Sequence, residues 1–254
     1  MIRARIVERR LKQLAQPARA RVLQSFFKTG PGQYGEGDRF LGLTLPQIRA
    51  LARECHDLSL REVERLLESR WHESRLLAVI LLANAYRRAD PRTQTAIYRL
   101  YLRRTDRINN WDLVDVSAPA VVGARLFTRS RQPLRRLARS TSLWERRIAI
   151  IATLYFIRRG ELAETLSIAE SLLSDAHDLI HKAVGWALRE VGKTDEAALQ
   201  RFLDRHASRM PRTALRYAIE RLDPAVRAGY LRVQPAVRRS KFEARISPSP
   251  RPRR

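Results

Sequence analysis

Apolar residues recur every three to four positions along most of this 254-residue chain, which is the pattern of amphipathic α-helices. No segment shows the two-residue alternation of a convincing strand ladder. The apolar faces and the breaks between them predict helices over residues 45–56, 60–69, 72–88, 91–104, 110–127, 131–140, 143–159, 162–173, 176–191, 195–206 and 211–222. Most connections are only a few residues long, which predicts a series of antiparallel helical hairpins.

Signals for helix starts agree with these boundaries. Three pairs match a capping box, in which a Ser or Thr caps the helix and a Glu or Gln three positions later reaches back: Thr44 with Gln47, Ser59 with Glu62, and Ser142 with Glu145. The dipeptides Asp90-Pro91 and Met210-Pro211 each place a proline where a helix can begin.

Several of the expected helices resemble one another: ESRLLAVILLANAYRR at 73–88, ERRIAIIATLYFIRRG at 145–160 and HKAVGWALREVG at 181–192. Aligning their apolar faces places Arg75, Asp112, Arg147 and Lys182 at equivalent positions, with spacings 112 − 75 = 37, 147 − 112 = 35 and 182 − 147 = 35. Paired helices with such a period are typical of HEAT-like repeats. We therefore expect an all-α fold, an α-solenoid over residues 1–231. The charged row is either a solvated stripe or the lining of a concave basic groove.

The charge of the chain points to a polyanionic partner. The formal net charge is +24, and all but five of the fifty basic residues are arginine. Residues 232–254, rich in Pro and Arg, contribute +7, which leaves 24 − 7 = +17 on residues 1–231. Arginine binds phosphate through two N–H groups, so nucleic acid is the favoured partner, although genome composition can also enrich arginine. The tail at 232–254 is expected to lack fixed structure.

Other function classes find little support in the sequence. No apolar run reaches the length of a membrane span, the basic N-terminus lacks a signal-peptide core, and Cys55 has no partner for a disulfide. A cytoplasmic monomer, associated with the nucleoid when bound to DNA, is expected. His177 and His181 are spaced i,i+4 without further ligands, which favours a surface or capping role over a metal site. The GPGQYG segment at 30–35 follows no strand, so it predicts no dinucleotide site, and no cofactor is expected.

One expected helix carries an unusual group of side chains. In RINNWDLVDVSAPAVVG, residues 107–123, Trp111 and Asp115 are four positions apart and share a helix face, and Asp112 lies beside them. The repeat spacing brings Arg147 and Trp186 of the following repeats to the same neighbourhood. Asp112 can complement the helix dipole. The remaining group is either a binding site or a structural ion pair with two core indoles.

Five segments together resemble the DNA alkylation repair family: FFKTGPGQYGEGDRFLGL (26–43), INNWDLVD (108–115), SLWERRIAIIATLYFIRRG (142–160), HDLIHKAVGWALREVGK (177–193) and MPRTALRYAIERL (210–222). They span roughly residues 1–231. The resemblance implies HEAT-like repeats and a monofunctional alkylpurine DNA glycosylase. Such an enzyme removes purines alkylated at N3 or N7, such as 7-methylguanine and 3-methyladenine, from duplex DNA and leaves an abasic site.

The resemblance also assigns roles to residues. It implies Asp115 as the catalytic carboxylate, Trp111 and Trp186 as the tryptophans of the cleft, and Arg147 as its arginine. Arg189 matches a position near the DNA backbone, and the charged row adds Lys182 and Arg75 as DNA-binding candidates. The chain departs from the family's type member at Asn110, where a further tryptophan stands, and in its longer Gly-rich loop. Tyr34 and Glu36 of that loop receive no role.

A single carboxylate is sufficient for this chemistry. A purine alkylated at N3 or N7 is already cationic and leaves as a neutral base, so it needs no general acid, unlike the leaving oxygen of a glycoside. An anion such as Asp115 can stabilise the sugar cation that remains. Two alternatives stay open: a non-catalytic HEAT-repeat protein that binds damaged or structured DNA, and a HEAT adaptor for a protein. The net charge of +24 argues against the adaptor.

Overall fold

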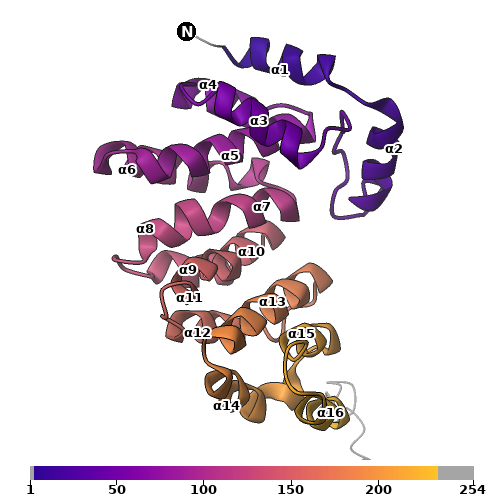
Figure 1. The fold of residues 1–254 in the computed structure, drawn as a ribbon, viewed down its shortest axis with the longest axis vertical. Coiled ribbons are helices and arrows are strands. Elements are labelled where there is room, and N and C mark those ends of the chain that lie inside the picture. The colour runs from indigo at the N-terminus through magenta and orange to yellow at the C-terminus, as the bar shows by residue number, and fades with distance from the viewer. Residues whose placement is uncertain (1–2, 234–254) are drawn as a thin grey trace, which may run out of the picture.

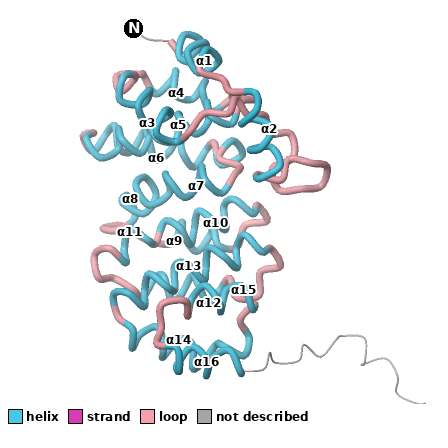
Figure 2. The backbone as a smooth tube through the Cα atoms, turned by 45° about the vertical axis from the view of Figure 1, so that its right-hand side comes forward, coloured by secondary structure: helices cyan, strands magenta, loops and turns pink. Residues whose placement is uncertain are grey.

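A computed structural model describes residues 3–233 and shows a curved stack of helical pairs, as predicted (Figure 1). These residues form helices and loops without a β-strand, apart from one isolated bridge between Arg39 and Trp71 (Figure 2). The α-helices are α1 (Ala4–Gln13), α2 (Pro17–Phe26), α3 (Leu45–Glu54), α4 (Leu60–Leu67), α5 (His72–Arg88), α6 (Pro91–Arg103), α7 (Trp111–Ala118), α8 (Ala124–Leu126), α9 (Gln132–Ala138), α10 (Leu143–Ala152), α11 (Leu154–Ile157), α12 (Ala163–Ser171), α13 (Asp178–Thr194), α14 (Glu196–His206), α15 (Arg212–Ala218) and α16 (Pro224–Arg232). Of the tail predicted at 232–254, only Arg232 and Val233 are described, and Arg232 is the last residue of α16. Residues 234–254 lie outside the described part of the chain.

The helices form two rows, and the inner row carries the site. Helices α5, α7, α10, α13 and α15 pack one against the next, while α4, α6, α9, α12 and α14 flank them. Helix α5 shows why this row is interior, because almost its whole circumference is apolar and buried, including Leu77, Ala78 and Val79. Its neighbours bury one face each, and the buried residues form one hydrophobic cluster from Ala4 to Leu222.

The predicted helix boundaries agree with the structure to within a few residues, and the caps explain most of them. Thr44 and Gln47 form the complete capping box. Ser59 and Ser142 cap only with their own hydroxyls. The glutamates of those two predicted boxes bind elsewhere: Glu62 accepts from the Ala4 N–H and Glu145 from the Thr105 hydroxyl. His177 caps α13, as expected, by accepting from the Leu179 N–H. Helices α1, α2 and α16 lie outside the predicted ranges, although Asp223-Pro224 before α16 is the same start signal as Asp90-Pro91.

Residues 111–126 run as one continuous helical segment through Pro119, because a π-turn at Pro119–Gly123 joins α7 to α8. Gly123 is required at this point: a Cβ there would lie 2.2 Å from the Ala152 carbonyl oxygen. The same contact occurs 62 residues later, where a Cβ on Gly185 would lie 2.5 Å from the carbonyl oxygen of Ala214. Glycine therefore sets the close approach of neighbouring inner helices at two places in the stack.

The four residues of the predicted charged row do occupy equivalent places. Arg75, Asp112, Arg147 and Lys182 all fall within the first five residues of α5, α7, α10 and α13. They do not form a solvated stripe, because Arg75 and Arg147 are only 2% and 5% exposed. Instead, charged side chains near these helix starts join one inner helix to the next.

Candidate functional site

A cleft of about 680 Å³ opens along the N-terminal ends of the inner helices. Six of the seven predicted site residues line it: Trp111, Asp115, Arg147, Lys182, Trp186 and Arg189. The carboxylate and both indoles therefore face one cavity, and neither indole is sealed in the core. The other lining residues are Phe26, Lys28, Tyr34, His177, Asp178, Leu179 and Tyr217.

Asp115 and Arg147 form the polar centre of the cleft. The Arg147 Nε and Nη2 atoms donate to the two Asp115 carboxylate oxygens at 2.9 and 2.8 Å, and Nη1 donates to the Leu179 carbonyl oxygen at 2.6 Å. This two-pronged pair links α7, α10 and α13 and fixes the plane of the carboxylate. Burial raises the pKa of Asp115, and the nearby Asp112 adds to this, while Arg147 opposes the rise. Arg147 thus favours the ionised carboxylate at a place where burial favours protonation.

The two tryptophans approach the cleft from different helices. Trp111 begins α7, where Asn110 caps the helix by accepting from the Trp111 backbone N–H at 2.8 Å. Its ring stacks on Phe27 with 5.1 Å between ring centroids and an interplanar angle of 17°. Trp186 lies in the middle of α13, and its indole N–H donates to Glu190 one turn later at 3.2 Å. Both rings are partly exposed, so each can offer apolar surface to a ligand.

Two further cations of the cleft, Lys182 and Arg189, are each paired with one acidic side chain. Lys182 lies 2.8 Å from Asp178 one turn earlier, and this hydrogen bond raises the pKa of Lys182. Arg189 pairs with Glu220 of the following segment, and its buried Nε has no hydrogen-bond partner within residues 3–233. Exposed pairs of this kind are worth about 0–1 kcal/mol. Both side chains can therefore exchange their partner for a phosphate at small cost.

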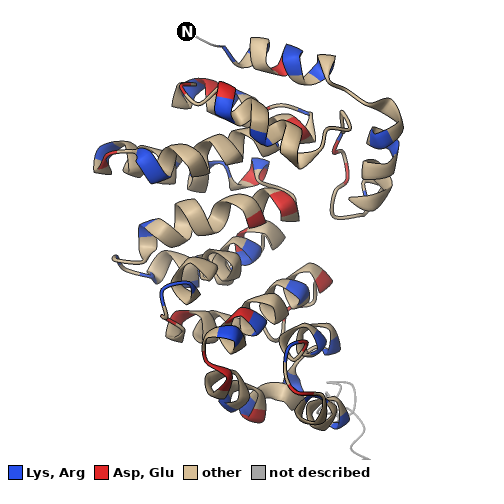
Figure 3. Ribbon diagram, viewed as in Figure 1, with Lys and Arg blue, Asp and Glu red and all other residues tan. Residues whose placement is uncertain are grey.

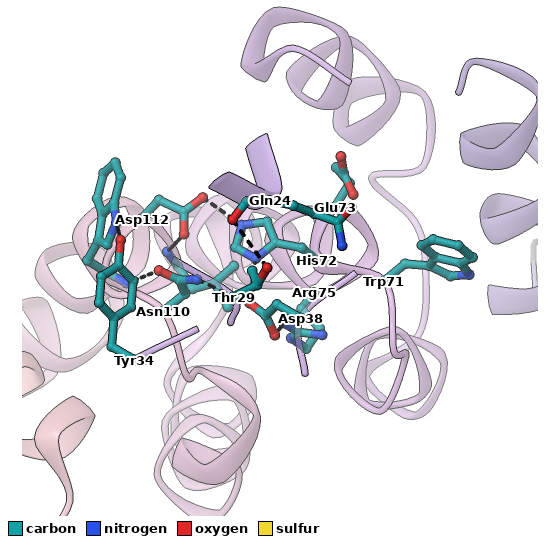
Figure 4. Close-up of polar contacts among 12 residues, drawn as sticks. Gln24, Thr29, Tyr34, Asp38, Trp71, His72, Glu73, Arg75, Asn110 and Asp112 are labelled. Carbon is teal, nitrogen blue, oxygen red and sulfur yellow. Dashed lines mark hydrogen bonds and ion pairs between the residues drawn. The ribbon is translucent and has the colours of Figure 1, made fainter. Parts of the chain in front are cut away.

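The expectation that Arg75 contacts DNA is wrong. Arg75 is 2% exposed, and its guanidinium binds Asp38 and the Ser69 carbonyl oxygen. Asp38, from the loop after α2, also accepts from Asn110 at 3.1 Å and lies 3.1 Å from His72 Nδ1 (Figure 4). Sequence spacing placed Arg75 correctly in the row, but it could not reveal that a distant loop supplies its counter-ion.

The same buried network accounts for Asp112. His72 Nε2 lies 2.8 Å from the Asp112 carboxylate, so one imidazole bridges Asp38 and Asp112 (Figure 4). Burial alone would lower the pKa of His72, but the two carboxylates outweigh it and raise that pKa to about 9. The opposite charge holds the pKa of Asp38 below its ordinary value in spite of burial. Asp112 is therefore a structural partner of His72 and does not line the cleft.

A second cleft of about 720 Å³ adjoins the first and shares Asp115 and Trp186 with it. It lies along the C-terminal ends of the inner helices and contains four arginines: Arg49, Arg87, Arg158 and Arg159. None of the four forms a salt bridge within residues 3–233, whereas many basic residues elsewhere on the stack lie near acidic ones (Figure 3). These arginines were not predicted, although the pairs Arg87-Arg88 and Arg158-Arg159 end two of the aligned helices.

Residues 3–233 offer neither a metal site nor a membrane-spanning helix. No group of three or more His, Cys, Asp or Glu side chains in this part of the chain is arranged to hold a metal ion. None of its helices is both long and apolar enough to cross a membrane.

Comparisons with known proteins point in one direction. A family model described as DNA alkylation repair enzyme matches residues 7–222. Among solved structures, a predicted DNA alkylation repair enzyme from Enterococcus faecalis has a TM-score of 0.64 at 19% sequence identity, over 83% of this chain and 97% of that one. That similarity shows a shared fold. No curated protein matches the chain. Because the family model covers most of its length, the chain belongs to the DNA alkylation repair enzyme family.

Proposed function

We propose that the protein is a monofunctional glycosylase that hydrolyses the N-glycosidic bond of N3- and N7-alkylated purines in duplex DNA. Membership of its family already gives it a role in the repair of alkylated DNA. The observation that carries the proposal is Asp115, a carboxylate held by Arg147 in a cleft with two partly exposed indoles and a surplus of cations. The proposed substrate is double-stranded DNA, bound by a monomer without a cofactor.

The reaction needs charge stabilisation more than proton transfer. When the bond between C1′ and the purine nitrogen breaks, its electron pair passes to the cationic ring, and the base leaves neutral. The deoxyribose is left with oxocarbenium character, water adds to C1′, and the proton of that water passes to solvent. The Asp115 carboxylate would lie against this developing positive charge, where a preorganised anion is most effective.

The surrounding side chains match the remaining tasks. Lys182 and Arg189 are poised to bind phosphates on either side of the lesion, since both are held only by exposed pairs. Trp111 and Trp186 would pack against the sugar-phosphate backbone at the lesion. Three of the five Arg147 N–H groups are bound to Asp115 and to the Leu179 carbonyl oxygen, so most of its hydrogen-bonding capacity is directed at the protein. We therefore assign it the orientation and ionisation of Asp115, and phosphate binding falls to the other cations.

The test is release of 7-methylguanine from methylated duplex DNA under single-turnover conditions, comparing wild type with Asp115→Asn. The amide is nearly isosteric, so we expect DNA affinity to stay within a few-fold while the rate falls about 10²–10³-fold. The matched control is Asp175→Asn. Asp175 forms a comparable, largely buried pair with Arg146, the residue next to Arg147 in the sequence, but it lines neither cleft. Its substitution should therefore leave the rate near wild type.

The outcomes separate the alternatives. If wild type releases no base yet binds duplex DNA with a steep salt dependence, the protein is a non-catalytic DNA-binding member of its family. The Asp115–Arg147 pair would then be purely structural, which is what its geometry also permits. If Asp115→Asn and Asp175→Asn lose activity equally, the loss reflects a damaged fold and the assignment of Asp115 is wrong.

A further inference from the structure

The Gly-rich loop at residues 28–38 is a built structure that no part of the proposed mechanism uses. Its own groups close it: the Gly30 N–H donates to Gln33 at 3.0 Å, the Gly32 N–H to Glu36 at 2.9 Å, and the Gly35 N–H to the Lys28 carbonyl oxygen at 3.1 Å. A Cβ on Gly35 would lie 2.5 Å from a backbone oxygen, so the loop needs glycine there. A loop with this much internal bonding presents its side chains in fixed positions.

Both ends of this loop are tied to the start of α7. Asp38, at its C-terminal end, binds Asn110, and Asn110 caps α7 at the Trp111 backbone N–H. At the N-terminal end of the loop, the Phe27 ring stacks on the Trp111 indole. The same phenyl ring also stacks on Phe40, with 5.0 Å between the two phenyl centroids. Phe26 also packs edge-on against the Trp111 indole, with 6.1 Å between ring centroids. Trp111 still lines the cleft and is partly exposed, so part of its ring remains for a ligand.

Tyr34, at the tip of the loop, completes the contact with Trp111. Its hydroxyl oxygen accepts the Trp111 indole N–H at 3.3 Å, and its ring meets Trp144 edge-on with 6.2 Å between centroids. Tyr34 also lines the cleft, as does Lys28 at the base of the loop.

The Tyr34 hydroxyl keeps an unused donor. A phenol can accept one hydrogen bond and donate its own proton in another, and Tyr34 has no acceptor for that proton within residues 3–233. Burial raises the pKa of Tyr34 while Lys182 and Arg147 act against the rise, so the hydroxyl is protonated at neutral pH and lies within range of the cleft cations. The natural acceptor in such a place is an anionic oxygen.

We propose that the loop at residues 28–38 is a DNA-binding element in which Tyr34 fixes the Trp111 indole and donates its own hydroxyl proton to a backbone phosphate oxygen of the bound strand. This inference rests on the proposed function only for the identity of the ligand. Tyr34 is thus a positioning residue for Trp111 and a ligand contact in its own right. Its indole contact forms in the free protein, and its phosphate contact forms only in the complex.

The test uses the full chain with Tyr34→Phe, which keeps the ring and removes only the hydroxyl. In the free protein, the indole N–H resonance of Trp111 should move while those of the other three tryptophans stay in place. Affinity for a duplex that contains a tetrahydrofuran abasic-site analogue should fall about tenfold or more, as expected for a hydrogen bond to a charged group. With a methylated substrate, the half-saturating enzyme concentration should rise more than the maximal rate falls.

A change in the DNA identifies the phosphate. Replacing single phosphates near the lesion by uncharged methylphosphonates should give one position at which wild type and Tyr34→Phe bind equally, because the contact is already absent there. The matched control is Tyr230→Phe on α16. That hydroxyl donates to Asp204 at 2.7 Å, outside both clefts, and its removal should leave DNA affinity unchanged.

Three results would overturn the inference: an unmoved Trp111 resonance, an affinity loss below about twofold, or a Tyr34→Phe defect that persists at every methylphosphonate position. Affinity and the indole resonance are measured without turnover. A protein that releases no base would therefore end the glycosylase proposal and still return a clear answer on Tyr34.

Discussion

The buried imidazole of His72 makes the stability of this protein depend on pH in an unusual direction. His72 is 2% exposed and lies between Asp38 and Asp112, and the Arg75 guanidinium acts on it as a like charge. The two carboxylates raise its pKa to about 9, although burial and Arg75 act in the opposite direction. In the unfolded chain the ordinary value of about 6.5 applies. The folded protein therefore binds this proton more tightly than the unfolded one.

The sign and size of the effect follow from linkage. Because the folded-state pKa is raised, the stabilisation is fully present below pH 6.5 and is lost as the pH rises through 9. A tenfold change in proton affinity corresponds to about 1.4 kcal/mol. The interval from 6.5 to 9 is then worth about 3 kcal/mol, a large part of the stability of an ordinary domain. The loss would fall on the anchor that joins the loop at 28–38 to α5 and α7.

The assay is urea unfolding of wild type and His72→Gln at about pH 6 and about pH 9.5, which bracket most of the transition. Glutamine retains a hydrogen-bond donor but does not titrate. At the lower pH, the variant should have a smaller free energy of unfolding than wild type. Between the lower and the higher pH, the free energy of unfolding should decrease by about 3 kcal/mol less in the variant than in wild type. Other titrating groups contribute equally to both proteins. If both lose the same stability over this interval, His72 is not the charged bridge described here.

Two further predictions concern the inner face of the stack. Replacing Arg158 and Arg159 together by alanine should weaken duplex binding and reduce the slope of log affinity against log salt by about 1–2, as expected if both contact phosphates in the second cleft. The same charge removed from helix α6, at Arg92 and Arg99, should leave that slope unchanged, and equal effects from both pairs would contradict the reasoning. Gly123→Ala should lower the free energy of unfolding by about 1–3 kcal/mol, because its Cβ would meet the Ala152 carbonyl oxygen. Thermal unfolding beside Gly229→Ala, whose Cβ meets nothing within 4 Å, checks this point, and an unchanged midpoint for Gly123→Ala would refute it.

The helices could be predicted from sequence because their causes are local. Apolar spacing and the proline after Asp90 act within one or two turns, and α5 and α6 begin at the predicted residues. The errors occur where a distant partner competes with a local one. Glu62 and Glu145 fit their capping boxes by spacing, yet each carboxylate binds a group 40 or more residues away. Nothing in a short window of sequence signals that choice.

The same distinction between local and distant causes separates the site residues that could be predicted from those that could not. Trp111, Asp115, Arg147 and Trp186 lie on regular helices, so repeat spacing together with the family resemblance was sufficient to bring them into one cleft. The loop could not be treated in this way, because its path depends on glycines at φ +70° and +82° and on an anchor at Asp38. For the same reason Arg75 was misassigned and Tyr34 received no role.

The charged row explains how one set of contacts can both hold the stack together and supply a site. Each inner helix begins with a side chain that reaches its neighbour: His72 to Asp112, then Asp115 to Arg147, then Arg147 to the backbone of α13. A buried pair of this kind adds little net stability, because desolvation offsets most of the attraction. It does fix a carboxylate in a defined plane beside a cavity. A carboxylate that is ionised in such a pair cannot protonate a leaving group. It can still stabilise a positive charge that develops beside it. A cationic alkylpurine is a substrate for which that second kind of carboxylate is enough.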